Sequence, residues 1–272
     1  MTPTLQIERH FSGPELELAR AAAAGKREEV ARLVRAGADP NAVSAGGLPL
    51  IAWPILQDNV DGVASLLDNG ANPNRAVPAA GTVMVWAAKA PNPRILDAFL
   101  EHGGDAEAGS ADREPLTRVA ALAGRWDNVQ RLVGHGAAVD AAAQDDDGDT
   151  LLAYYSAGQF DKAHWLLEHG ADPGHRIAKS AVAQRIGTQP IVENIYWWPV
   201  QAGRFPELAQ WQRRCQDLLA ARGFAAPAEP AHLARLRASQ PGDGSHDAAP
   251  PRDLDAAIRE GETAIRQEQR KH

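Results

Sequence analysis

A short segment that contains glycine recurs along this chain at a nearly constant interval. It reads LVRAGADPN at 33–41, LLDNGANPN at 66–74 and LLEHGADPG at 166–174. The recurring glycines are spaced by 33, 33, 33 and 34 residues, and they are Gly37, Gly70, Gly103, Gly136 and Gly170. Self-similarity at a fixed period of this length predicts a repeat architecture, in which each unit contacts its neighbours in the chain.

Each period predicts two short antiparallel helices and a loop. The first helix is rich in small residues, as in ELARAAAA, and the second has apolar residues at helical spacing, as in Val30, Leu33 and Val34. The glycine that follows lies where a helix ends in the left-handed conformation. The segment ADPN then turns the chain, because Pro stops the helix and Asx side chains bond the local backbone. One such unit cannot bury its own apolar face, so the units must stack.

These residues resemble a known family. GADPN at a 33-residue period, with GGLPLIAW (46–53) and REPLTRVAA (113–121) in place of the usual G-x-TPLHxAA, is similar to ankyrin repeats over residues 15–224. The resemblance implies an all-α solenoid of about six helix-turn-helix units with short loop or hairpin connections. It also implies a partner-binding scaffold rather than an enzyme. The Thr-Pro-Leu-His signature is never complete, so the repeats are degenerate.

The repeat also predicts where the domain begins and ends. The expected segments are an extended lead-in (1–14), the repeat domain (15–224) with an enlarged last unit (175–224), a Pro/Gly-rich linker (225–251) and a short helical tail (252–272). The last unit is enlarged because Gly170 and Gly223 stand 53 residues apart, and its segment FPELAQWQRRCQDLLAARG predicts an outer helix about two turns longer than usual.

The enlarged unit contains the densest aromatic cluster of the chain, IVENIYWWPV, with Tyr196, Trp197 and Trp198. One interpretation is a structural cap that hides the last apolar face of the array. The other is an anchor for a partner, since Trp and Tyr dominate binding hot spots.

Two further aromatic positions repeat with the period. Trp53 and Trp86 lie 33 residues apart, both early in inner helices, and Tyr154 and Tyr155 occupy a similar place in the fifth unit. These rings either pack between units or form the apolar floor of a groove, because inner helices line the concave side of a solenoid. All four residues are predicted to bind the partner, together with Tyr196, Trp197 and Trp198.

Charge is concentrated in one stretch of the chain. Residues 101–149 contain eleven Asp or Glu against four Arg and no Lys, a net −7 that equals the net charge of all 272 residues. Such a field repels nucleic acid and attracts basic surfaces. The predicted partner is therefore a protein with a basic surface. Carboxylates at the loop tips should attract it, so these residues are also predicted to bind the partner: Asp112, Asp145, Asp146, Asp147 and Asp149.

The acidic run DDDGD also raises the possibility of a calcium loop. An EF-hand loop needs glycine at its sixth position and a bidentate Glu at its twelfth. Counted from Asp145, these positions hold Thr150 and Ser156, so the run is predicted to be a lengthened loop tip between units four and five.

The remaining candidates for chemistry have structural explanations. His102, His135 and His169 recur at 33 and 34 residues directly before the repeat glycine, where an imidazole bonds free carbonyls at a helix end. Cys215, the single cysteine, is predicted to pack inside the last outer helix. No HExxH, CxxC or glycine-rich phosphate motif occurs. We expect no catalytic residues, no metal site and no cofactor.

The sequence thus predicts a monomeric, non-catalytic scaffold that binds a protein through its concave face and acidic loop tips. Standalone bacterial ankyrin proteins that this chain resembles often neutralise a co-encoded toxin or secreted effector, so an immunity role is the alternative. The sequence contains no stretch of about 18 apolar residues, so it does not predict membrane insertion. The expected location is the cytoplasm, or the periplasm if a leader has been removed.

Overall fold

The computed structural model describes residues 6–77, 80–142, 150–175 and 190–229. The chain divides into the units Met1–Ala228 and Glu229–His272, and the fold below is that of the first. The predicted tail at 252–272 lies outside the described residues.

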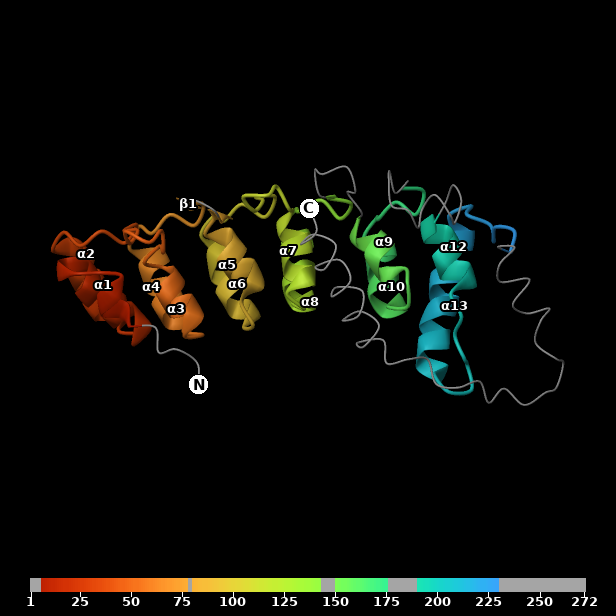
Figure 1. The fold of residues 1–272 in the computed structure, drawn as a ribbon, viewed down its shortest axis with the longest axis horizontal. Helices are drawn as coiled ribbons and strands as arrows, with labels where there is room; N and C mark the ends of the chain where they lie inside the picture. The colour runs from red at the N-terminus through yellow and green to blue at the C-terminus, as the bar shows by residue number, and fades with distance from the viewer. Residues whose placement is uncertain (1–5, 78–79, 143–149, 176–189, 230–272) are drawn as a thin grey trace, which may run out of the picture. The chain divides into compact units, whose positions relative to one another are not determined.

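Six helix pairs follow one another along the described part of the first unit (Figure 1). The inner helices are α1 (Gly13–Ala23), α3 (Ala52–Leu56), α5 (Met84–Lys89), α7 (Leu116–Leu122), α9 (Leu151–Tyr155) and α12 (Pro190–Trp197). The outer helices are α2 (Arg27–Arg35), α4 (Val60–Asp68), α6 (Pro93–Glu101), α8 (Trp126–Gly134), α10 (Phe160–Glu168) and α13 (Pro206–Ala221). This is the predicted all-α solenoid of six helix-turn-helix units.

Neighbouring units stack through like helices. Each inner helix contacts the next inner helix, and α2, α4, α6 and α8 form a second continuous row, while α10 packs on α13. The loops between units contain short antiparallel pairings: the hairpin of β1 (Ala76–Val77) with β2 (Gly81–Thr82), and isolated bridges at Val43–Pro49 and Gly109–Pro115. The core is one continuous apolar cluster that runs through all the units, as stacking requires.

The recurring glycines have the conformation that the sequence predicted. All five adopt φ between 81° and 102°, the left-handed region, directly after an outer helix. A different constraint acts on Gly62 in α4, where a Cβ atom would lie 2.0 Å from the backbone oxygen of Ala22. Gly62 therefore lets α4 approach the end of α1.

The predicted lead-in is not simply extended. Residues Ile7–Arg9 form a 3-10 helix (η1), and Ile7 and Phe11 are buried. Extended chain would leave both side chains in water, whereas the turn brings them onto the exposed end of the first unit. α1 begins at Gly13, two residues before the predicted boundary.

The last unit is enlarged as the spacing predicted. α13 has 16 residues, whereas each of the other outer helices has 9. It joins the fifth unit through Cys215, whose thiol donates to the Phe160 carbonyl (3.2 Å), and through Arg222, whose guanidinium donates to the carbonyls of Leu167 and Ala171.

Candidate protein-binding site

Two cavities lie on the side of the repeats formed by inner helices and loops. The first, here called the inner-helix pocket, has a volume of about 480 Å³. It is lined by Ile55 and Leu56 of α3, by Val85, Trp86 and Lys89 of α5, and by Ala80, Ala90, Pro91 and the loop residues Ser110, Ala111 and Asp112.

Apolar side chains dominate the inner-helix pocket, whose lining also includes two charged residues, Lys89 and Asp112. Leu56 is 47% exposed although it is a large aliphatic residue. Trp86 is partly buried, and its indole N–H is buried without a hydrogen-bond partner among the described residues. Lys89 and Asp112 are exposed. The pocket therefore offers an apolar surface and charges of both signs, a combination suited to a side chain of a protein partner.

The exposed apolar surface continues along the inner helices. Leu56 and Leu122 hold equivalent positions two periods apart, with Lys89 between them, and Leu122 is 62% exposed. Tyr154 of α9 is 46% exposed. Such large apolar side chains cost solvation free energy when a protein leaves them in water, and they mark interaction surfaces when they cluster.

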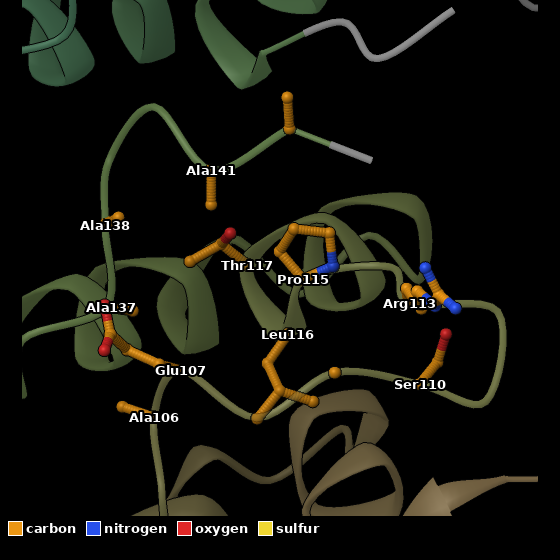
Figure 2. Close-up of a pocket in the computed structure, with 12 residues that line it drawn as sticks. Ala106, Glu107, Ser110, Arg113, Pro115, Leu116, Thr117, Ala137, Ala138 and Ala141 are labelled. Atoms are coloured by element: carbon orange, nitrogen blue, oxygen red, sulfur yellow. The ribbon is translucent and has the colours of Figure 1, made fainter. Parts of the chain in front are cut away.

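The second cavity, here called the loop pocket, lies between the loops that precede units four and five and has a volume of about 430 Å³. The residues that line it come from the two loops and the start of α7: Ala106, Glu107, Gly109, Ser110, Arg113, Pro115, Leu116, Thr117, Ala137, Ala138, Ala141 and Ala142. Figure 2 shows Glu107 and Arg113 at opposite ends of the group, with Leu116 and Thr117 between them. Thr117 is 1% exposed, and its hydroxyl has no hydrogen-bond partner among the described residues.

The structure divides the predicted aromatic residues into surface and core. Trp86 lines the inner-helix pocket and Tyr154 is exposed. Trp53 is 4% exposed and lies against His10 (ring centroids 6.0 Å apart), and Tyr155 is 3% exposed and lies edge-on to Trp126 (5.3 Å). Trp53 and Tyr155 therefore belong to the packing between units and offer almost no surface to a partner, which corrects their assignment to a groove floor.

The aromatic cluster of the last unit makes its polar contacts within that unit. The Tyr196 hydroxyl donates to the Phe224 carbonyl (3.1 Å), and the Trp197 indole N–H donates to the Pro227 carbonyl (3.1 Å). Trp198 packs beside Gly158, where a Cβ atom would lie 3.1 Å from its indole nitrogen. These contacts favour the cap interpretation over the anchor interpretation.

Asp112 is the one predicted carboxylate that the structure places in a cavity. Asp145, Asp146, Asp147 and Asp149 lie outside the described residues. Asp140 has a structural role, because its carboxylate accepts from the backbone N–H of Asp172 (3.0 and 3.1 Å). Burial raises the pKa of Asp140.

Two of the three histidines at the helix ends, His102 and His169, bond carbonyls as predicted. The Nδ1 of His102 lies 2.7 Å from the Ala98 oxygen, and that of His169 lies 2.8 Å from the Trp165 oxygen. The Nε2 of His102 contacts Asp68 at 3.0 Å, and this contact raises the pKa of His102.

The thiol of Cys215 is buried, and desolvation raises its pKa to about 12. A thiol in that state is a packing group rather than a nucleophile. Within the described ranges, no cluster of three or more His, Cys, Asp or Glu side chains could hold a metal ion. None of the described helices has the length and apolarity needed to cross a bilayer.

Sequence reasoning missed several residues of the pockets and of the exposed apolar surface. Leu56 of the inner-helix pocket and the exposed Leu122 could have been found, because their spacing is two periods and neither fits the small-residue pattern of inner helices. Thr117 could also have been found, because it occupies the place of the signature histidine in REPLTRVAA. That its hydroxyl lacks a partner follows only from the packing.

Comparisons with known proteins agree with this fold. A family model described as ankyrin repeats (3 copies) matches residues 84–177. A similar solved structure is the ankyrin repeat domain of Bcl-3, titled a unique member of the IkappaB protein family, with 20% identity, 73% of this chain and 85% of that chain covered, and a TM-score of 0.56. A search of curated proteins found no match. The chain therefore carries ankyrin repeats, and the helix pairs on either side of the matched residues continue the same solenoid.

Proposed function

We propose that the protein is a non-catalytic scaffold that binds a protein partner through the inner-helix pocket and the neighbouring loops. The observation that carries the proposal is the meeting of Leu56, Trp86 and Asp112 around one cavity. An apolar side chain of the partner would enter between Leu56 and Trp86. Burying both groups of apolar atoms supplies the affinity.

The charge of the loops supports a basic partner. The segment 101–149 holds all of the net negative charge of the chain, and Asp112 brings part of it to the pocket rim. Exposed rim charges act mainly on the association rate and on the choice of partner. Lys89 also lines the pocket and repels a basic group, so it favours the orientation in which the basic group of the partner lies beside Asp112.

The test begins with capture of partners from the native organism on the full chain, followed by binding measurements with the purified partner. Leu56→Glu should weaken binding at least tenfold, because it places a charge in the apolar part of the pocket. Asp112→Asn should lower the association rate several-fold and reduce its salt dependence. Phe205→Ser is a matched control, because Phe205 is also an exposed apolar residue (39%) but lies at the start of α13.

A partner that binds Leu56→Glu and wild type equally would exclude the inner-helix pocket as the binding site. If the captured partner is an enzyme whose activity falls when the complex forms, the protein acts as an inhibitor, as the immunity alternative predicts.

A further inference from the structure

The loops of most neighbouring units are tied by one Asx side chain, here called a rung. Asn41 accepts from the Asn72 N–H (2.7 Å) and donates to the Gly70 carbonyl (2.8 Å). One period later, Asn74 accepts from the Asp105 N–H (2.7 Å) and donates to the Gly103 carbonyl (2.8 Å). The side chain of Asp140 supplies the acceptor in the same place between units four and five, as described above.

The rung between units three and four is missing. The equivalent position, 33 residues after Asn74, holds Glu107, and the equivalent backbone donor is the N–H of Ala138. In the described residues, the Glu107 carboxylate makes no hydrogen bond to Ala138, and the Ala138 N–H has no other partner. A carboxylate also has no N–H to donate, so Glu107 cannot imitate an asparagine amide.

The loop pocket opens at this missing rung. Glu107 and Ala138 both line it, and so does Thr117, whose buried hydroxyl has no partner. Leaving a buried hydroxyl without a hydrogen bond is unfavourable, and a ligand that bonds it removes this penalty. The cavity therefore presents a backbone donor, a carboxylate acceptor and a hydroxyl that can act as either, with alanine side chains around them.

We propose that the loop pocket binds a primary carboxamide, the side chain of an Asn or Gln on an extended segment of the protein partner. The carboxamide oxygen accepts from the Ala138 N–H, as the side chains of Asn41 and Asn74 accept from the equivalent N–H groups elsewhere, and the amide NH₂ donates to the Glu107 carboxylate. The Thr117 hydroxyl bonds the same group or the backbone beside it. The inference rests on the proposed function, because it assigns the ligand to the same partner.

Charge and size select this ligand over others. A carboxylate is repelled by Glu107 and brings no donor, while an ammonium group brings only donors and cannot accept from Ala138. Arg113 lies at the far end of the pocket from Glu107 (Figure 2). The volume of about 430 Å³ exceeds that of a carboxamide several-fold, so the backbone that carries it enters as well.

The test uses small probes on the ¹⁵N-labelled full chain, so that it does not depend on the partner. Propionamide should produce saturable shifts in the backbone amide signals of Ala138 and Thr117, with a dissociation constant on the order of 10 mM, as expected for a ligand of a few atoms. Propionate and butylammonium should produce much smaller shifts. Absence of saturable propionamide shifts at these two residues, or tighter binding of butylammonium, would overturn the proposal.

Variants test the assignment of the groups. Glu107→Asn should supply the rung from the chain itself, so it should abolish propionamide binding and raise the thermal midpoint by about 2 °C. Thr117→Val keeps the shape and removes the hydroxyl, so it should weaken binding about tenfold. Glu28→Asn, an exposed glutamate of α2, should change neither property.

Unchanged propionamide binding in Glu107→Asn would contradict the proposal. Failure of the carboxamide site is distinguishable from failure of the proposed function. Loss of all probe binding leaves the partner's sensitivity to Leu56→Glu untouched, whereas a partner indifferent to Leu56→Glu leaves the probe results untouched.

Discussion

The contact between units three and four has buried side-chain hydrogen bonds at its helix end, but it lacks a rung at its loop end. At the start of the outer helix, Asn128 is 1% exposed, and its side-chain amide donates to the carbonyls of Ala88 and Ala90, both at 3.0 Å. At the loop end, Glu107 and Ala138 both line the loop pocket, and no hydrogen bond joins them. The loop end of the contact between units two and three differs, because there the Asn74 side chain makes two hydrogen bonds to the next unit.

The difference shows how a repeat protein can separate stability from binding. Each unit contacts only its neighbours, so every contact between units must be strong enough to hold the array together. The buried bonds of Asn128 meet that need at the helix end, where water cannot replace them. The loop end of the same contact is then free to leave polar groups for a ligand.

The largest expected effect follows from removing the buried hydrogen bonds of the Asn128 side chain. Asn128→Leu keeps the side-chain volume but leaves the Ala88 and Ala90 carbonyls without their donor, and it should lower the free energy of unfolding by about 2–3 kcal/mol. Urea unfolding followed by circular dichroism measures the loss. Gln57→Leu, which replaces an exposed amide, should change stability by less than about 0.5 kcal/mol. Equal losses in the two variants would mean that Asn128 does not hold this contact.

A smaller effect should separate the two loop ends. Asn74→Ala removes two exposed hydrogen bonds and should cost about 1–2 kcal/mol, whereas Glu107→Ala removes none between units and should stay within about 0.5 kcal/mol. Denaturant unfolding of both variants under one buffer condition gives the difference. If Glu107→Ala proves as costly as Asn74→Ala, the rung between units three and four is formed in solution and the loop pocket is closed.

The sequence was sufficient to predict the fold because the period carries its own physical reason. Gly37, Gly70 and the later repeat glycines all end an outer helix with positive φ, and the count of units follows from their number. The excess of residues before Gly223 correctly predicted the longer α13. These features depend on local conformation, which a short stretch of sequence determines.

The site was less predictable, because its residues depend on contacts across units. Trp53 and Trp86 have the same register, yet the lead-in covers the first, where His10 lies beside Trp53, and the second opens onto the inner-helix pocket. The period predicts which positions are equivalent, but it does not predict which of them are buried by a neighbouring segment of the chain. The rungs were missed for a similar reason. The ADPN segments were interpreted as local turns, and the Asn41 N–H does donate to the Asp39 carboxylate, but the Asn41 side chain reaches the next unit.

The smallest expected effect is a pH dependence confined to the contact between units two and three. Both ring nitrogens of His102 contact oxygen atoms, those of the Ala98 carbonyl and the Asp68 carboxylate, and the protonated imidazolium can donate to both. The hydrogen bond with Asp68 raises the pKa of His102 above its usual value. One period later Glu101 and His135 stand in the equivalent places, and the described structure shows no hydrogen bond between their side chains.

A raised pKa in the folded state means that His102 stabilises the fold fully below its unfolded pKa. This contribution is lost as the pH rises through the folded pKa. The difference in unfolding free energy between wild type and His102→Gln should therefore be largest near pH 6 and shrink towards pH 8.5. Its size should be only about 0.5 kcal/mol, because Asp68 is 53% exposed and water screens the pair. His135→Gln should show no such trend, and a trend of equal size in both variants would assign the pH dependence to the helix ends rather than to the pair with Asp68.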